Sequence, residues 1–119
     1  MYLDSGLNVR TDFEAQNPNT VKAMMRALMK ATDYINNTPL DKVAGTLSKP
    51  LNVPAEDLAA IMKQNIYSNV VDQHVMDGLT TLMGWMLDQK YVSKPIAPKE
   101  IYDLTLLQQI APDHIKVKP

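Results

Sequence analysis

Residues 17–37 read NPNTVKAMMRALMKATDYINN, and this stretch decides the fold class of the chain. Asn17 is a favourable residue for capping a helix N-terminus, and Pro18 suits the first helical position, where a backbone N–H is not needed. Apolar residues then recur at spacings of three and four, which is the pattern of an amphipathic helix. These residues are Val21, Met24, Met25, Leu28, Ala31 and Ile35. The sequence therefore predicts a long helix over residues 18–36.

The methionine-rich face of this helix has two interpretations. Met fills irregular gaps in protein cores, so the face is expected to pack inside the protein. The alternative is a soft surface that grips a partner helix or an apolar ligand. On the core interpretation, Leu28→Ala costs roughly 2–5 kcal/mol and Lys30→Ala stays within about 0.5 kcal/mol. Lys22, Arg26 and Lys30 then form a solvated basic stripe, or a docking stripe for an acidic partner.

Helical patterns continue through the rest of the chain. The expected helices cover residues 39–48, 54–66, 73–89 and 99–110. Pro50 is expected to stop the first of these, while Pro98 and Pro112 confine the last. Gly78 and Gly84 are small positions at which another backbone is expected to approach the fourth helix of the chain closely.

One segment has the alternating pattern of a strand. It covers residues 7–9, follows Gly6, and alternates apolar with polar side chains. A lone strand cannot satisfy its own backbone hydrogen-bonding groups, so it is expected to pair with another copy or to be irregular. No multi-stranded sheet is expected within the chain. The predicted fold class is mainly α, with four to five amphipathic helices after one N-terminal strand.

Size and composition narrow the classes of protein further. A chain of 119 residues is the size of one domain or a piece of one, so we treat residues 1–119 as a single domain or fragment. The net charge of −1 and the absence of a basic block argue against nucleic-acid binding. Polar residues interrupt every apolar run, so we expect no helix that spans a bilayer. The sequence therefore predicts a soluble protein. The first ten residues, MYLDSGLNVR, lack the pattern of an export leader.

No pattern of catalytic or metal-binding residues is present in the sequence. The chain has no Cys, and its two histidines, His74 and His114, do not form a metal-binding motif. Phosphate-binding glycine loops and the nucleophile elbow of hydrolases are also absent. We therefore expect no catalytic residues, no metal site and no cofactor.

The order of five sequence features resembles a known family. The features are LNVRTDF, NPNTVKAMMRALMKATDYINNTP, LNVPAEDL, MDGLTTLMGWMLDQKYVSKPI and DLTLL. In this order and spacing they resemble the C-terminal portion of the periplasmic solute-binding proteins of ABC importers, in the group that takes nitrate, sulfonate, taurine or thiamine precursors. The resemblance extends from about Leu7 to Ile110.

The resemblance implies a fold, a location and partners. Such proteins have two α/β lobes, close around a small anion or heterocycle in the periplasm, and deliver it to an ABC permease without catalysis. On this resemblance, the chain would be the segment that crosses back into the first lobe, together with the helices that pack on that lobe. The residues that would face a solute are Tyr2, Asp4, Ser5 and Gly6. Most of the ligand cleft would lie outside this sequence, so the solute is not identified.

Two alternatives remain beside this interpretation. In the first, the chain is an independent small helical protein that associates with itself or a partner. In the second, it resembles the thiamine-pyrimidine synthases, which share the two-lobed fold. The second is disfavoured because the iron site of those enzymes contains Cys, which is absent here. For the isolated chain we expect self-association into a homo-oligomer and no binding of the family's solutes.

Overall fold

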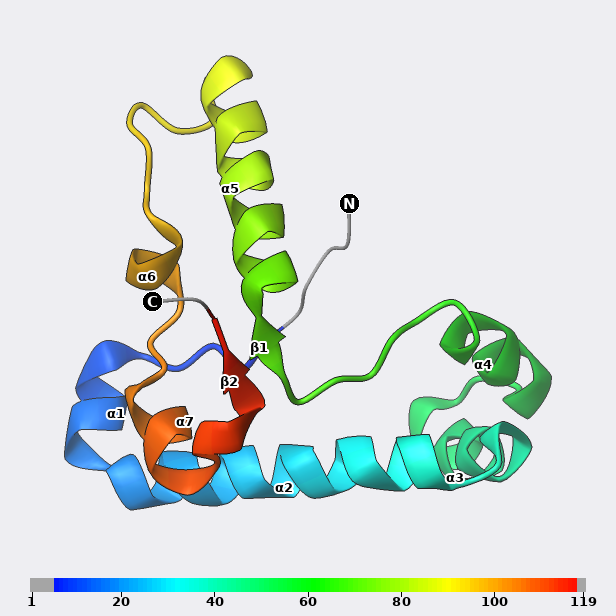
Figure 1. Ribbon diagram of the computed structural model, residues 1–119. Helices are drawn as coiled ribbons and strands as arrows, with labels where there is room; N and C mark the ends of the chain where they lie inside the picture. The colour runs from blue at the N-terminus through cyan, green and yellow to red at the C-terminus, as the bar shows by residue number, and fades with distance from the viewer. Residues whose placement is uncertain (1–5, 118–119) are drawn as a thin grey trace. The chain divides into compact units, whose positions relative to one another are not determined.

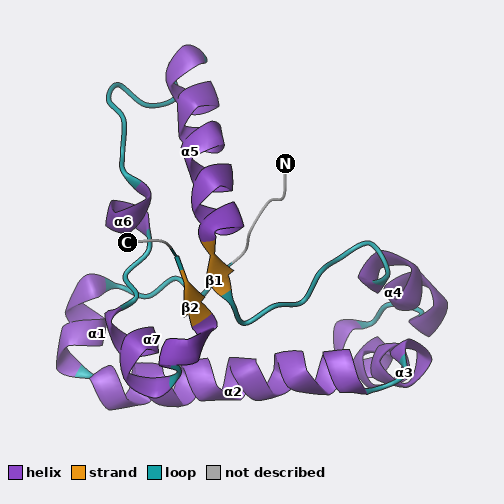
Figure 2. Cartoon of the chain, in the orientation of Figure 1, coloured by secondary structure: helices purple, strands orange, loops and turns teal. Residues whose placement is uncertain are grey.

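The computed structural model describes residues 6–117 and is mainly helical, with 67% of these residues in helices. Figure 2 shows that β1 and β2 are the strands of the described chain and that they lie side by side. The elements, labelled in Figure 1, are α1 (Thr11–Gln16), α2 (Pro18–Asn37), α3 (Leu40–Leu51), α4 (Ala55–Met62), β1 (Val71–Asp72), α5 (Gln73–Asp88), α6 (Pro98–Ile101), α7 (Thr105–Ile110), the 3-10 turn η1 (Pro112–His114) and β2 (Ile115–Lys116). The expected helical class is confirmed.

The chain divides into two compact units. The terminal unit comprises Met1–Met25 and Val70–Pro119, and the central unit comprises Arg26–Asn69. Each unit has its own small set of buried apolar side chains. In the terminal unit these are Val21, Leu106, Leu107 and Ala111. In the central unit they are Val43, Ala44, Leu58 and Met62.

Helix α2 matches the expected long helix, but its buried side differs from the expected one. Val21 is buried, and Met25 and Met29 are half-buried. Met24 and Leu28 were expected in the core, yet they are 45% and 50% exposed. The reason is that the side of α2 bearing Met25 and Met29 receives the chain's other segments, so the adjacent side is left without a neighbour.

Contacts to α2 are made on this packed side in both units. Lys22 Nζ donates to Gln109 Oε1 at 2.9 Å, so Lys22 is not part of a purely solvated stripe. Asn69 Nδ2 donates to the backbone oxygen of Met29 at 3.3 Å. Asn36 Nδ2 donates to the backbone oxygen of Tyr67 at 3.0 Å. Amide side chains thus tie the later turns of α2 to the segment that leaves the central unit.

Helices α3 and α4 form the hairpin of the central unit, and α3 runs past the expected stop. It includes Pro50 and ends where Asn52 adopts a left-handed conformation with φ of 52°. Two backbone bonds close this end, from Asn52 N to Lys49 O at 3.3 Å and from Val53 N to Ser48 O at 3.2 Å. A proline in the last turn removes only one helical hydrogen bond, so the left-handed cap, rather than Pro50, ends the helix.

Helix α4 is shorter than expected. It ends at Met62, whereas the apolar spacing predicted a helix to residue 66. The side chain of Asn65 donates to the backbone oxygen of Ile61 at 2.9 Å, and Asn65 N bonds to Met62 O at 3.2 Å. Asn65 therefore satisfies carbonyl groups that further helical turns would have used, which ends the helix.

The terminal unit contains a short parallel pair of strands in place of the expected N-terminal strand. Val71 pairs with Ile115 and Asp72 with Lys116. Residues 6–10 are irregular, which is one of the two outcomes expected for the predicted strand, and α1 follows them. The expectation that residues 7–9 are the only strand of the chain was therefore wrong. Strand β2 was unexpected because it lies in the tail, where two residues carry no recognisable pattern.

Helix α5 agrees with its predicted bounds. Its N-cap is Asp72, whose Oδ1 accepts from Val75 N at 3.2 Å. A Cβ built on Gly78 or Gly84 would meet no atom within 4 Å, so the expected close approach of another backbone is absent from the described chain. Trp85 on this helix is 52% exposed, and its ring centroid lies 5.5 Å from that of Tyr91.

The helix expected over residues 99–110 is two helices. Tyr102 is extended with ψ of 106°, and the chain turns there between α6 and α7. Asp103 Oδ1 then accepts from Thr105 N at 2.8 Å and satisfies a free donor at the start of α7. Asp103, which falls inside the single helix expected over residues 99–110, therefore lies at the start of a second helix.

Candidate functional site

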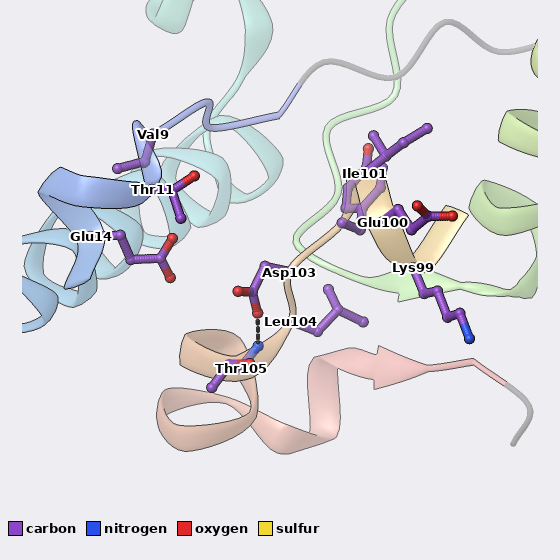
Figure 3. Close-up of a pocket in the computed structure, with 10 residues that line it drawn as sticks. Val9, Thr11, Glu14, Lys99, Glu100, Ile101, Asp103, Leu104 and Thr105 are labelled. Atoms are coloured by element: carbon purple, nitrogen blue, oxygen red, sulfur yellow. Dashed lines mark hydrogen bonds between the residues drawn. The ribbon is translucent and has the colours of Figure 1, made fainter. Parts of the chain in front are cut away.

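A polar cleft lies in the terminal unit between α1 and the segment that joins α6 to α7. Its volume is about 640 Å³. The lining side chains include hydroxyls, three carboxylates and one ammonium group. They are Val9, Thr11, Glu14, Lys99, Glu100, Ile101, Tyr102, Asp103, Leu104 and Thr105. Figure 3 shows Glu14 on α1 and Asp103 on the joining segment at opposite sides of this cleft.

Gly6 is the one sequence-predicted site residue that the structure describes. Tyr2, Asp4 and Ser5 lie outside the described residues. Gly6 is exposed, and a Cβ built on it would lie 3.9 Å from the hydroxyl oxygen of Tyr102, a lining residue of the polar cleft. Of the four residues that the resemblance assigned to the ligand, Gly6 thus lies beside a residue of the polar cleft.

Two of the three carboxylates in the polar cleft are held by local bonds. Hydrogen bonds from the Thr105 hydroxyl and backbone N–H lower the pKa of Asp103, because they favour the charged form. Glu100 Oε1 accepts from the backbone N–H of Ala97 at 3.0 Å. Glu14 is therefore the carboxylate of the polar cleft that is most accessible to a ligand. With three carboxylates and one ammonium group, the cleft favours cationic or hydroxylated ligands over anions.

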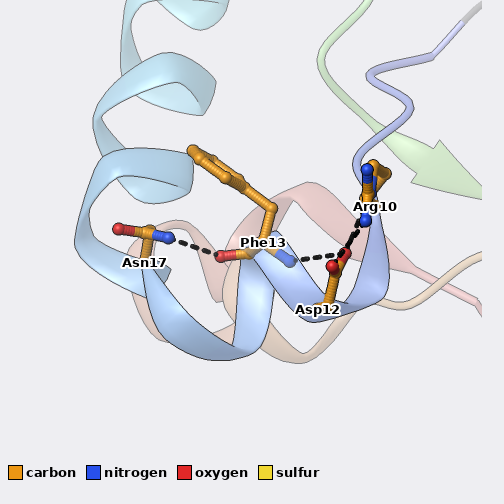
Figure 4. Close-up of polar contacts among 4 residues, drawn as sticks. All are labelled: Arg10, Asp12, Phe13 and Asn17. Atoms are coloured by element: carbon orange, nitrogen blue, oxygen red, sulfur yellow. Dashed lines mark hydrogen bonds and ion pairs between the residues drawn. The ribbon is translucent and has the colours of Figure 1, made fainter.

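A salt bridge fixes the start of α1 next to the polar cleft (Figure 4). Arg10 donates from Nε to Asp12 Oδ1 at 3.0 Å and from Nη2 to Asp12 Oδ2 at 2.6 Å. Asp12 Oδ1 also accepts from Phe13 N at 3.0 Å. The bond from Arg10 is the main cause that lowers the pKa of Asp12. At the other end of α1, Asn17 Nδ2 donates to Phe13 O at 3.2 Å.

A second, mainly apolar groove runs along α5 in the same unit. Its volume is about 460 Å³. It is lined by Thr80, Met83, Gly84, Leu87, Pro95, Ile96, Ala97, Pro98 and Glu100. Pro95, Ala97 and Pro98 give this groove a rigid wall with few polar groups. The groove is shaped for aliphatic groups, whereas the polar cleft is shaped for hydroxyl or charged groups.

The histidines do not form a metal site within residues 6–117. No group of three or more His, Cys, Asp or Glu side chains there is placed to hold a metal ion. His74 is exposed on α5, and His114 is half-buried in η1, with a buried Nδ1 that has no hydrogen-bond partner. Among the same residues, no helix combines the length and apolar character needed to cross a membrane.

Sequence reasoning missed every lining residue of the polar cleft. The stretch KEIYDLT at residues 99–105 carries most of the polar side chains, and it was interpreted as the first turns of one helix. Its density of charged and hydroxyl residues between two helix starts is a signal of an irregular, exposed segment. Comparison with protein-family models, with curated proteins and with solved structures finds no match to this chain.

Proposed function

We propose that the chain is the C-terminal part of a solute-binding protein that serves an ABC importer of the nitrate, sulfonate and taurine type. In its full-length form such a protein captures a small anion or heterocycle in the periplasm, without catalysis, and delivers it to a membrane permease. The observation that carries the proposal is the order of the five sequence features from Leu7 to Ile110. No single feature among them has this specificity.

The distribution of apolar surface supports this proposal. Met24 and Leu28 on α2 and Trp85 on α5 are each close to half exposed. Within residues 6–117, the eight buried apolar residues are divided between two units, so the described part of each unit has a small core. Helices that cover a sheet in a two-lobed protein need such apolar sides, and those sides are exposed when the sheet is missing.

On this proposal, the polar cleft forms one edge of the ligand site. It lies beside Gly6, at the segment that would cross between lobes, and Thr11 and Tyr102 offer hydroxyl groups there. Three carboxylates against one Lys side chain make it a poor site for nitrate or a sulfonate on its own. The anion-binding groups would therefore come from the rest of the full-length protein.

The decisive experiment combines sequencing of the gene with a binding measurement on the longest protein that the gene encodes. The DNA upstream of Met1 is read for an in-frame extension, and the extended protein is titrated with taurine, nitrate and a thiamine precursor by calorimetry. We expect an extension that encodes a leader and a first lobe, and saturable binding of one solute. A stop codon directly upstream, with a ribosome-binding site before Met1, would contradict the proposal.

A second candidate function is favoured by α2. Its exposed apolar side is what an independent helical protein would use to associate with itself or with a partner helix. Hydrodynamic measurement of the 119-residue chain distinguishes this candidate, because a solute receptor needs no such association.

A further inference from the structure

The apolar groove of the terminal unit, which we call the α5 groove, is formed by one side of α5 and by the segment that leads into α6. The α5 residues that line it are Thr80, Met83, Gly84 and Leu87. Their spacings of three and four residues place them on one side of the helix, away from Trp85. From Thr80 to Leu87 the helix rises about 10 Å along its axis. The α5 groove is therefore an elongated apolar surface within one unit.

Gly84 leaves space in the α5 groove. It lies inside a helix, where glycine is less favourable than alanine. A Cβ built on Gly84 would meet no atom within 4 Å, so contacts among the described residues do not require a glycine there. Because Gly84 lines the groove, a larger side chain at this position would occupy space that is now open to a ligand.

The α5 groove and the polar cleft meet at one residue. Glu100 lines both, so the two cavities are neighbours along α6. The Oε1 atom of Glu100 accepts from Ala97 N at 3.0 Å, and this bond fixes the carboxylate at the start of α6. A ligand with an aliphatic chain in the groove would thus have its polar end beside a fixed negative charge.

The charges on the polar side of Glu100 have mainly the same sign. Glu14 and Asp103 add two carboxylates there, whereas Lys99 is the one cation among the residues that line the two cavities. Figure 3 shows the Lys99 side chain extending away from Glu14 and Asp103. Opposite charges attract and like charges repel, so a cationic end group is favoured over an anionic one at this position.

We infer that the α5 groove binds a small aliphatic ammonium compound, with its alkyl chain along Met83, Gly84 and Leu87 and its ammonium group at Glu100. The groove volume of about 460 Å³ is in the range of small-molecule sites. Burial of the alkyl chain supplies most of the affinity, and the charged contact with Glu100 sets the orientation.

Other occupants of the α5 groove fit its chemistry less well. A fatty acid would bring its carboxylate to Glu100, where like charges repel. An anionic membrane surface is attracted by Lys and Arg, and the residues that line the groove include neither. The inference goes beyond the proposed function, since the solute of that proposal is a small anion or heterocycle bound with residues outside this chain.

Titration of the isotope-labelled 119-residue chain with octylammonium, followed by amide NMR resonances, tests the inference. We expect the Gly84 and Ala97 resonances to shift saturably, with a dissociation constant on the order of 0.1–1 mM. Octanoate has the same chain with the opposite charge and should bind at least about tenfold more weakly. Butylammonium has the same charge with a shorter chain and should also bind at least about tenfold more weakly. Equal affinities for octylammonium and octanoate, or no saturable shift up to about 10 mM, would overturn the inference.

Two glycine variants of α5 test the position of the alkyl chain. Gly84→Leu fills the α5 groove and should weaken octylammonium binding at least about tenfold, because the buried chain loses its place. Gly78→Leu is the matched control, since a Cβ at Gly78 also meets no atom within 4 Å but Gly78 lines neither cavity. Both variants replace a helical glycine by a better helix former, so circular dichroism should show α5 retained. Unweakened binding by Gly84→Leu would contradict the assigned groove.

A variant of Glu100 tests the position of the ammonium group. Glu100→Gln removes the charge but keeps a side-chain oxygen that can accept from Ala97 N, so α6 should keep its start. It should lose most of the preference for octylammonium over octanoate, a change of about tenfold in the ratio of their affinities. Asp88→Asn removes a carboxylate of α5 that lines neither cavity and should leave the ratio unchanged. The same ratio in Glu100→Gln and in the unchanged protein would show that Glu100 does not hold the ammonium group. Titration of the extended protein with taurine or nitrate tests the proposed function separately.

Discussion

Asp103 accepts hydrogen bonds from Thr105, and both the hydroxyl and the backbone N–H of Thr105 lower the pKa of Asp103. Thr105→Val should raise the pKa of Asp103 towards its usual value, since the hydroxyl is lost, while the remaining backbone donor keeps part of the shift. Thr105→Ser should preserve the low pKa. Carboxyl resonances followed by NMR through an acid titration measure all three proteins. An unchanged pKa in Thr105→Val would mean that the hydroxyl does not bond to Asp103.

The same carboxylate gives α7 a pH-dependent contribution to stability. Because the pKa of Asp103 is lowered in the folded state, its contribution is present above the unfolded pKa and is lost as the pH falls through the folded pKa. Asp103→Ala should cost about 1 kcal/mol near neutral pH, the usual effect of removing a side chain that caps a helix start. The difference between the two proteins should disappear in acid. A constant difference in free energy of unfolding at all pH values would show that packing, not the charged bond, is the cause.

Leu58 and Leu28 allow a buried helix residue of the central unit to be compared with an exposed one. Leu58 on α4 is 8% exposed, so Leu58→Ala should cost roughly 2–5 kcal/mol. Leu28 on α2 is 50% exposed, so Leu28→Ala should cost about 1 kcal/mol or less, in contrast to the sequence-based expectation. Chemical denaturation of both variants beside the unchanged protein measures the two costs. Equal costs would mean that a part of the chain covers Leu28.

At the scale of the element, Asn52 determines where α3 ends. It has φ of 52°, a conformation that Gly and Asn adopt more readily than other residues. Asn52→Gly should keep or slightly raise the thermal stability of the α3–α4 hairpin, whereas Asn52→Val should lower the free energy of unfolding by about 1–2 kcal/mol. Circular dichroism melts of the two variants measure this difference. If Asn52→Val melted at the same temperature as Asn52→Gly, the left-handed conformation assigned to residue 52 would be contradicted.

The helices whose bounds the sequence predicted well are those whose start residue and apolar spacing can be read from neighbouring residues. Pro18 and the apolar spacing that follows it predicted α2, and the apolar spacing after residue 72 predicted α5, because these signals lie within a few residues of one another. The pairing of Val71 with Ile115 was not predictable in this way, since it joins residues far apart in the sequence through a ladder of two residues. Local patterns also fail to show which side of an amphipathic helix its neighbours cover, which is why Leu28 was misplaced.

At the scale of the whole molecule, the candidate site was less predictable than the fold. Gly6 was named in advance because of the family resemblance, and it borders the polar cleft. The opposite wall of that cleft, around Tyr102 and Asp103, exists only because the chain breaks between α6 and α7. At that break Asp103 accepts a hydrogen bond from Thr105 N, which the expectation of one continuous helix did not include.

The last prediction concerns solute binding by the 119-residue chain. A two-lobed receptor gains affinity by closing two walls around its solute, and a single wall immobilises too few groups of a small anion. The described cleft adds an opposing effect, because Glu14, Glu100 and Asp103 place negative charge where nitrate or a sulfonate would sit. We therefore expect no heat of binding when the chain is titrated with taurine, nitrate or a thiamine precursor up to millimolar concentrations.

A variant of the polar cleft makes this titration informative in either direction. Glu14→Gln removes the carboxylate that local bonds do not hold, so it lessens the repulsion of anions without disturbing the contacts of Asp103 or Glu100. If the missing wall is the main obstacle, Glu14→Gln should bind as little as the unchanged chain. Binding that appears only in Glu14→Gln would instead identify charge as the obstacle and the cleft as a sufficient enclosure. Tight binding by the unchanged chain would contradict both reasons, because the complete site would then lie within these residues.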